Sequence, residues 1–288
     1  MDGLSELGRA WTFDPVVALP LVGLGGSYAA AARSVSQRHP NRPWPRSKAA
    51  AFFAGLALAW FALLGPVGRY DDVFFWAHMT QHLLLMMVVA PLLLLGAPVL
   101  LALRACSPAT RHDVLVPVLR SKPVRLLTDP TFSWLLFAGV VVGTHFTPFY
   151  DVALRHRWVH LGVEHPLYLG AGLLYFYPLL GSNPAPRRPA PALRVVSLFL
   201  MMVPETLTGF FLYMSSYVRY PFYASGHRPF GPGPLADQQL GGALMWAGSM
   251  VVDAVWIALG TLEWLSAEER RSRRLDAQLA QETAAAAV

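Results

Sequence analysis

The chain has 288 residues, of which 55% are hydrophobic and only 14% are charged, and its mean hydropathy is +0.41. Because soluble domains contain about 25% charged residues, this composition excludes a water-soluble globule, and we expect a lipid bilayer to cover much of the surface. The net charge of +6 would favour nucleic acid as partner of a soluble protein, but here it lies in loops between apolar segments, so anionic lipid is expected instead, with no nucleic acid.

Apolar runs long enough to cross a hydrocarbon core of ~30 Å recur along the whole chain, each bordered by turn residues or charges. We predict an all-α polytopic membrane protein, with a seven-transmembrane-helix bundle over residues 1–265 and a cytoplasmic tail over residues 266–288. The tail begins as a charged helix and ends in an alanine run, so we expect it to be frayed or disordered. The predicted spans are 15–32, 49–65, 74–101, 131–148, 158–180, 194–217 and 239–265.

The orientation follows from the positions of the 23 lysine and arginine residues. Most of them lie in every second connection, and positively charged connections stay on the cytoplasmic side of a membrane. We therefore expect the N-terminus outside and the C-terminus in the cytoplasm. The basic segments are 33–48, 102–130, 181–194 and the tail.

The histidines are unevenly distributed across this topology. Of nine, only His39 and His112 lie in predicted cytoplasmic loops. His78 and His82 are four residues apart in the third span, so they share one helix face, which Met86 continues. Two imidazoles at this spacing can reach one metal ion without backbone strain. The single cysteine excludes a cysteine-based cage.

The fourth and fifth spans place further histidines at the same outer depth. His160 and Glu164 repeat the spacing of four, His165 follows one step around the helix, and His145 ends the fourth span. Histidine with methionine suits copper, and histidine with glutamate suits zinc. We predict one outer metal site from these residues, with Glu164 as a carboxylate that orients the ligands. The alternative is that the histidines are interfacial or hydrogen-bonding core residues. The candidate ligands are His78, His82, His145, His160 and His165.

Two carboxylates lie inside predicted spans. Glu205 is in the sixth span and Asp253 in the seventh, both ~15–20 Å from the helix ends at 1.5 Å per residue. Ionisable groups at this depth are expensive and commonly functional. They could supply a path for an ion, or they could be protonated or hydrogen-bonded groups that lock helices together.

Several short segments, in order from about residue 70 to 250, resemble CtaG-like cytochrome c oxidase assembly factors. The resemblance implies a seven-helix protein of the bacterial plasma membrane that acts on cytochrome c oxidase subunits, with copper as its ion and delivery of copper as the suspected role. It implies no catalysis. The segments are His78 to Met86, Ala90-Pro91, Gly96 to Pro98, Thr144 to Tyr150, Val159 to His165, Gly172 to Pro178, Tyr220 to Tyr223, Asp237 to Gly242 and Met245-Trp246.

Two other functions remain open from the residues. A transporter of copper or another metal would use Glu205 and Asp253 as a path, and a haem or quinone redox protein could use His82 with His145 or His160 as axial ligands. A retinal protein is excluded, because its Schiff base needs a buried lysine and the only lysines, Lys48 and Lys122, lie in cytoplasmic loops. No nucleophile–base pair, phosphate loop or dinucleotide fingerprint is present, so no enzyme is expected.

Overall fold

The computed structural model describes residues 10–181, 183–226 and 228–286, and these residues form helices and no strand. The first half of the chain forms α2 (Pro15–Arg38), α3 (Arg46–Leu64), α4 (Pro66–Arg69), α5 (Phe75–Leu83), the π-helical η1 (Leu84–Val89), α6 (Ala90–Leu95), α7 (Pro98–Ala105), α8 (Pro108–Thr110), η2 (Arg111–Leu115), α9 (Val116–Arg120) and α10 (Lys122–Leu127). The second half forms α11 (Pro130–Phe146), α12 (Phe149–Arg155), α13 (Arg157–Val159), η3 (His160–Glu164), α14 (His165–Leu179), α15 (Pro191–Tyr213), α16 (Pro221–Ser225), α17 (Pro234–Ala243), η4 (Leu244–Gly248) and α18 (Ser249–Ala286).

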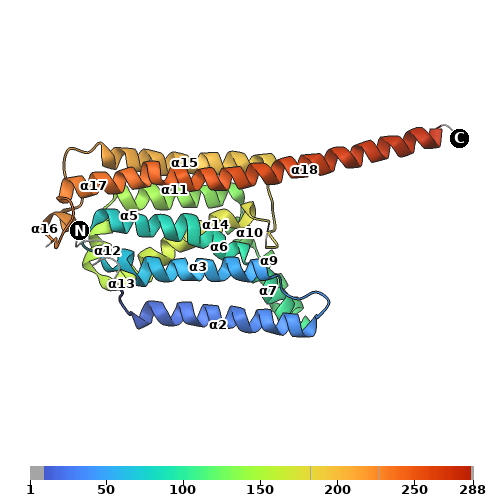
Figure 1. Ribbon diagram of the computed structural model, residues 1–288, viewed down its shortest axis with the longest axis horizontal. Coiled ribbons are helices and arrows are strands. Elements are labelled where there is room, and N and C mark those ends of the chain that lie inside the picture. Colours follow the sequence, from blue (N-terminus) through green and yellow to red (C-terminus); the bar gives the residue numbers. More distant parts are fainter. Residues whose placement is uncertain (1–9, 182, 227, 287–288) are drawn as a thin grey trace.

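The long helices lie side by side with nearly parallel axes (Figure 1). The helix α2 packs on α3, α3 packs on η1 and α6, α14 packs on α6 and α11, and α15 packs on α11, α17 and α18. Two small residues allow the closest approach of α15 to α17, since a Cβ on Gly209 would lie 2.8 Å from the carbonyl oxygen of Gly242. Glycines at helix contacts bring backbones together where apolar burial cannot drive association.

Five helices of the described chain are long and apolar enough to cross a membrane, and six are if α11 and α12, which meet at 75°, form one broken span. The remaining predicted span, 158–180, corresponds to α13, η3 and α14. Its histidines, Glu164 and tyrosines lower its hydropathy. The chain is thus a multi-pass helical membrane protein, and the count of seven and the orientation stay predictions.

The connections gather at two opposite ends of the bundle. The segment between α2 and α3, the short helices α7, α9 and α10, and the extension of α18 lie at one end, on the right in Figure 1. These elements cover three of the four basic segments of the sequence, as expected if every second connection lies on the same side. The first residues of α2 and α5 lie at the other end, together with α12, α13 and α16, and we call this the site end.

The tail is helical, and the expectation that it is frayed or disordered is wrong for the described residues. The helix α18 continues to Ala286 and extends beyond the bundle (Figure 1). Alanine is the strongest helix former. In addition, Arg273 forms an ion pair with Glu269, which lies one helical turn earlier in the chain. Local propensity therefore continues the helix without tertiary contacts.

Candidate metal centre

Three imidazoles surround one buried carboxylate at the site end. On α5, His78 Nε2 lies 3.0 Å and His82 Nε2 lies 3.5 Å from Oε1 of Glu164. From η3 itself, His160 Nδ1 lies 2.6 Å from Oε2 of the same residue. The residues spaced four apart therefore share one face on each of the two helices, as predicted, and the two faces meet at Glu164.

The π-helical turn η3 brings a fourth histidine into the cluster. In a π-helix residues five apart stack, whereas in an α-helix they diverge. The ring centroids of His160 and His165 are accordingly only 4.4 Å apart. In a regular α-helix the side chain of His165 would point away from the face that carries His160. The local widening of the helix corrects that placement.

A second carboxylate, Asp71, lies behind His160 in the loop before α5. Its Oδ2 is 3.2 Å from His160 Nε2 and accepts a hydrogen bond of 2.8 Å from the amide of Gln81. Burial acts to raise the pKa of Asp71, but the hydrogen bond and charge of His160 outweigh it and hold that pKa below its usual value. Asp71 is therefore an ionised group at the edge of the cluster.

The hydrogen bonds around the rings determine which nitrogens have free lone pairs. The Tyr223 hydroxyl donates to the Asp71 carbonyl oxygen at 2.6 Å, so it accepts from His78 Nδ1 at 2.9 Å. The Nε2 lone pair of His78 then faces Glu164 Oε1, and a proton or a metal ion must lie between them. Similarly, Gln81 Oε1 accepts from His165 Nε2, which leaves Nδ1 of His165 buried with no partner among the described residues.

The side chain of His145 lies apart from this cluster. Its Nδ1 donates to the Val141 carbonyl oxygen at 2.6 Å, and its Nε2 lies 3.3 Å from the sulfur of Met79. The hydroxyl of Tyr150 connects the two groups, at 3.2 Å from His145 Nε2 and 3.0 Å from His82 Nδ1. The five histidines predicted to form a single site therefore separate into two groups. His145 occupies a neighbouring position, and we call the other group the histidine–carboxylate cluster, which consists of His78, His82, His160, His165, Glu164 and Asp71.

The donor set of the histidine–carboxylate cluster fits a divalent ion. Two groups of three ligand atoms lie within 4.8 Å of one another in the described part of the chain, and His160 belongs to both. Imidazole nitrogen with carboxylate oxygen is the ligand chemistry of Zn²⁺ and Cu²⁺. Tyr223 and Gln81 supply the hydrogen bonds that orient metal-bound imidazoles. The groups are Asp71, His160 and His165, and His78, His160 and Glu164.

A polar cavity of about 310 Å³ reaches the cluster from the site end. Asp71, His160 and His165 lie on its inner wall, and Asp72 lines it as well. Burial, and then the charge of Asp71, raise the pKa of Asp72. Asp14 and Arg157 form an ion pair in its lining. An ion could approach the cluster through this cavity without crossing the apolar part of the bundle.

Sequence reasoning missed four residues of the site: Asp71, Gln81, Tyr150 and Tyr223. Asp71 precedes α5 by four residues and reads as an ordinary loop acid, because only the fold brings it to His160. The two tyrosines belong to the segments Thr144 to Tyr150 and Tyr220 to Tyr223, which carried the family resemblance. Those segments were the signal that could have identified them.

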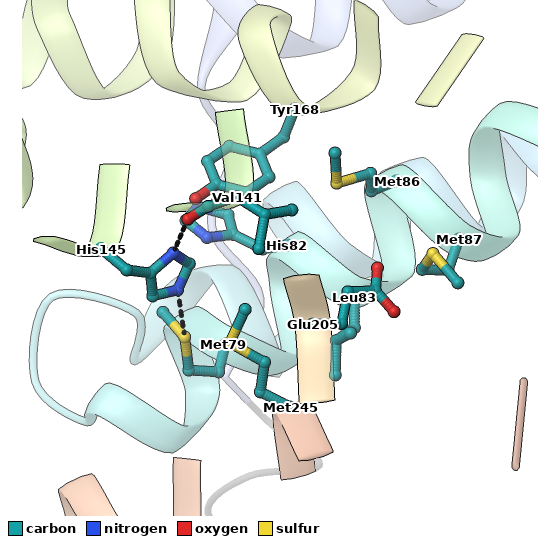
Figure 2. Close-up of a pocket in the computed structure, with 10 residues that line it drawn as sticks. All are labelled: Met79, His82, Leu83, Met86, Met87, Val141, His145, Tyr168, Glu205 and Met245. Carbon is teal, nitrogen blue, oxygen red and sulfur yellow. Dashed lines mark hydrogen bonds between the residues drawn. The ribbon is translucent and has the colours of Figure 1, made fainter. Parts of the chain in front are cut away.

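The two intramembrane acids lie outside the histidine–carboxylate cluster. Glu205 and Asp253 are buried on α15 and α18, and three of their four carboxylate oxygens have no hydrogen-bond partner among the described residues. Glu205 lines a small cavity with His82, His145 and four methionines (Figure 2). Asp253 does not line this cavity.

The family model of the cytochrome c oxidase caa3 assembly factor, Caa3_CtaG, matches residues 26–267. An uncharacterised protein of Mycobacterium tuberculosis (strain CDC 1551 / Oshkosh) is 32% identical over 284 residues, covering 95% of this chain and 42% of that protein. One of Mycobacterium leprae (strain TN) is 29% identical over 275 residues, covering 92% and 41%. The chain thus spans about two fifths of these relatives, and no solved structure matches it. It belongs to the family of caa3 cytochrome c oxidase assembly factors.

Proposed function

We propose that this protein supports the assembly of a haem–copper cytochrome c oxidase in a bacterial plasma membrane by binding copper at its outer face. The histidine–carboxylate cluster is the binding site, and the protein is a metal-handling factor that catalyses no reaction. The observation that supports this most is the position of Glu164, within 3.5 Å of His78, His82 and His160. An arrangement of this kind needs protons or a metal ion between its lone pairs.

The position of the cluster at the site end supports binding of copper from the outer compartment. The first residues of α5 and the helix α13, which flank the cluster, lie at the end of the bundle opposite the basic connections (Figure 1), and the positive-inside rule assigns those connections to the cytoplasm. The cavity at Asp71 and Asp72 opens there. An oxidase receives its exposed copper centre from that compartment, so a site open to it suits an assembly factor. The family assignment favours oxidase subunits as partners.

Haem binding fits this site less well. The rings of His78 and His82 have centroids 4.2 Å apart, and His82 stacks on Tyr168 at 3.7 Å. The cavity beside His82 has a volume of about 10 Å³, and a bis-histidine haem needs a space for the whole macrocycle between its two ligands. A Soret band in the purified protein would nevertheless restore this alternative.

A metal transporter is the second candidate, because Glu205 and Asp253 lie buried below the site. Transport requires polar groups across the whole membrane. Uptake of copper into vesicles that contain the purified protein distinguishes the two functions. We expect metal to bind without crossing the membrane, and time-dependent accumulation inside the vesicles would favour the transporter.

Deletion of the gene tests the assembly role. We expect lower oxidase activity, subunit abundance and oxidase copper content in the deletion strain, with activity restored by the wild-type gene and by His112→Ala, a control at an exposed histidine of η2. The variant His78→Ala/His82→Ala should fail to restore activity. Normal oxidase in the deletion strain would refute the role, and full restoration by the double variant would favour a scaffold that needs no metal.

A further inference from the structure

A small cavity beside the histidine–carboxylate cluster has a different ligand chemistry. It lies between α5, η1, α11, α14, α15 and η4, has a volume of about 10 Å³, and is lined mainly by thioether and imidazole groups (Figure 2). A space of this size accommodates about one water-sized atom. Its lining includes Met79, Met86, Met87, Met245, His82, His145 and Glu205.

A chain of hydroxyl groups directs the lone pair of His145 toward Met79. Thr144 donates to the Val140 carbonyl oxygen at 2.8 Å, so it accepts from Tyr168, whose oxygen in turn accepts from Tyr150 at 2.6 Å. The Tyr150 oxygen therefore accepts from His82 and has no proton for His145. These proton positions follow from the network of donors and acceptors.

The Nε2 lone pair of His145 consequently faces a lone pair of the Met79 sulfur. Its Nδ1 proton is used by the Val141 carbonyl oxygen, and its Nε2 faces the Met79 sulfur at 3.3 Å. Neither atom of the neutral imidazole and thioether carries a proton for the other, so a proton or a metal ion must complete the contact. A backbone carbonyl that accepts from the second ring nitrogen is the usual orientation of a metal-binding histidine.

Glu205 lies across the cavity from His145 (Figure 2) and is the carboxylate on the lining that can balance the charge of a buried cation. It is 1% exposed, it lines the cavity, and its Oε2 has no hydrogen-bond partner among the described residues. A cation in an apolar interior is costly unless a carboxylate neutralises it. One carboxylate balances one positive charge, and thioether with imidazole favours a soft ion.

We propose that this cavity is a second metal site, which binds one monovalent soft ion of the Cu⁺ or Ag⁺ class through His145 Nε2 and Met79 Sδ. Met245 lines the same cavity and its sulfur is a further donor, whereas Met86 and Glu205 lie on the side of the cavity away from His145 (Figure 2). The site is distinct from the histidine–carboxylate cluster, whose imidazole and carboxylate donors suit divalent ions. It does not depend on the role in oxidase assembly.

Binding of Ag⁺ and of Cu⁺ without oxygen, to the full chain purified in detergent, tests the proposal. The variant Met79→Leu/Met245→Leu conserves volume and removes both sulfurs, so we expect it to fold and to lose at least about tenfold in affinity for both ions. Met214→Leu, at an exposed methionine, is the matched control and should bind as the wild type does. The variant His78→Ala/Glu164→Gln, which changes only the neighbouring cluster, should retain Ag⁺.

X-ray absorption at the silver edge of the wild-type protein provides a test that needs no variant. We expect at least one sulfur neighbour together with one nitrogen neighbour. A first shell of nitrogen and oxygen alone, or unchanged Ag⁺ affinity in the folded methionine variant, would overturn the proposal. Loss of Ag⁺ binding in that variant would support it even if oxidase assembly were normal in the deletion strain, so the two proposals fail separately.

Discussion

The hydroxyl of Tyr150 lies 3.0 Å from Nδ1 of His82. The same hydroxyl is 2.6 Å from that of Tyr168, whose ring stacks on His82 at a centroid distance of 3.7 Å. His82 is thereby held with its Nε2 toward Glu164, on the boundary between the histidine–carboxylate cluster and the methionine cavity. Two tyrosines thus orient an imidazole that borders both candidate sites, Tyr150 through its hydroxyl and Tyr168 through its ring.

Removal of this hydroxyl should weaken metal binding and lower stability together. In Tyr150→Phe the buried Nδ1 of His82 loses its acceptor, at a cost of ~1–3 kcal/mol in the free energy of unfolding. Loss of a group that orients a ligand lowers metal affinity by about 10- to 100-fold. Calorimetric metal titration and thermal unfolding measure both effects. Tyr213→Phe, at an exposed tyrosine, is the control, and equal behaviour of the two variants would contradict the assigned role.

Substitution of the central carboxylate should remove the divalent site. Glu164→Gln keeps the shape of a buried side chain but removes the charge that faces His78, His82 and His160. We expect affinity for Cu²⁺ or Zn²⁺ to fall by at least about 100-fold. Glu268→Gln, on the exposed part of α18, should leave it unchanged. Undiminished binding in Glu164→Gln would place the metal elsewhere.

Acid should destabilise the protein partly through Asp71. Burial acts to raise the pKa of this carboxyl group, but the hydrogen bond and charge of His160 outweigh burial and hold the pKa below its usual value of 3.8. A carboxyl group with a depressed folded-state pKa stabilises the fold above its unfolded-state pKa, and this contribution is lost as pH falls through the folded-state value. We expect the melting temperature of the wild type to drop below about pH 4 more steeply than that of Asp71→Asn. Parallel curves for the two proteins would show that Asp71 is not paired in this way.

A single glycine should control how closely α14 packs on η1. A Cβ on Gly172 would lie 2.4 Å from the Met86 carbonyl oxygen, whereas one on Gly170 would meet nothing within 4 Å. Gly172→Ala should therefore lower the free energy of unfolding by ~1–3 kcal/mol through overpacking. Gly170→Ala should be neutral or slightly stabilising, since alanine is the better helix former. Equal melting temperatures would mean that the two helices separate without cost.

Reporter fusions test the predicted orientation. Fusions at Ser36, Ser121 and the C-terminus should all report a cytoplasmic location, because they lie in the basic segments that gather at one end of the bundle. A fusion within 214–233 should report the outer compartment. An external signal from any of the first three would invalidate the assignment of the histidine cluster to the outer face.

The helices were predictable because hydrophobic runs and their borders determine where a chain can cross lipid. The spacing of His78 and His82 also predicted a shared face, since α5 is a regular α-helix. The position of His165 was less accurate, because it was read with the period of a regular α-helix, whereas η3 is a π-helical turn that ends directly before His165 and Pro166. Asp71 and the separation of His145 could not be predicted, since both depend on contacts between segments far apart in the chain.

The continued helix of α18 shows a different limit. A charged segment that ends in alanines can be a stable helix or a frayed one, and composition alone does not decide between them. In the structure the ion pair of Arg273 with Glu269, one turn apart, accompanies a continuous helix. Local propensity was the better guide here than the general tendency of chain ends to be disordered.

The copper content of the purified protein tests the central claim most directly. After exposure to Cu²⁺ in air and removal of loosely bound ions, we predict one tightly held copper per chain in the wild type and in His112→Ala. The variant His78→Ala/His160→Ala removes two of the three ligands in one group, and His160 is also a ligand in the other group. This variant should hold no copper, provided that its circular dichroism shows a folded helical protein. Equal copper in this folded variant and in the wild type would contradict the account.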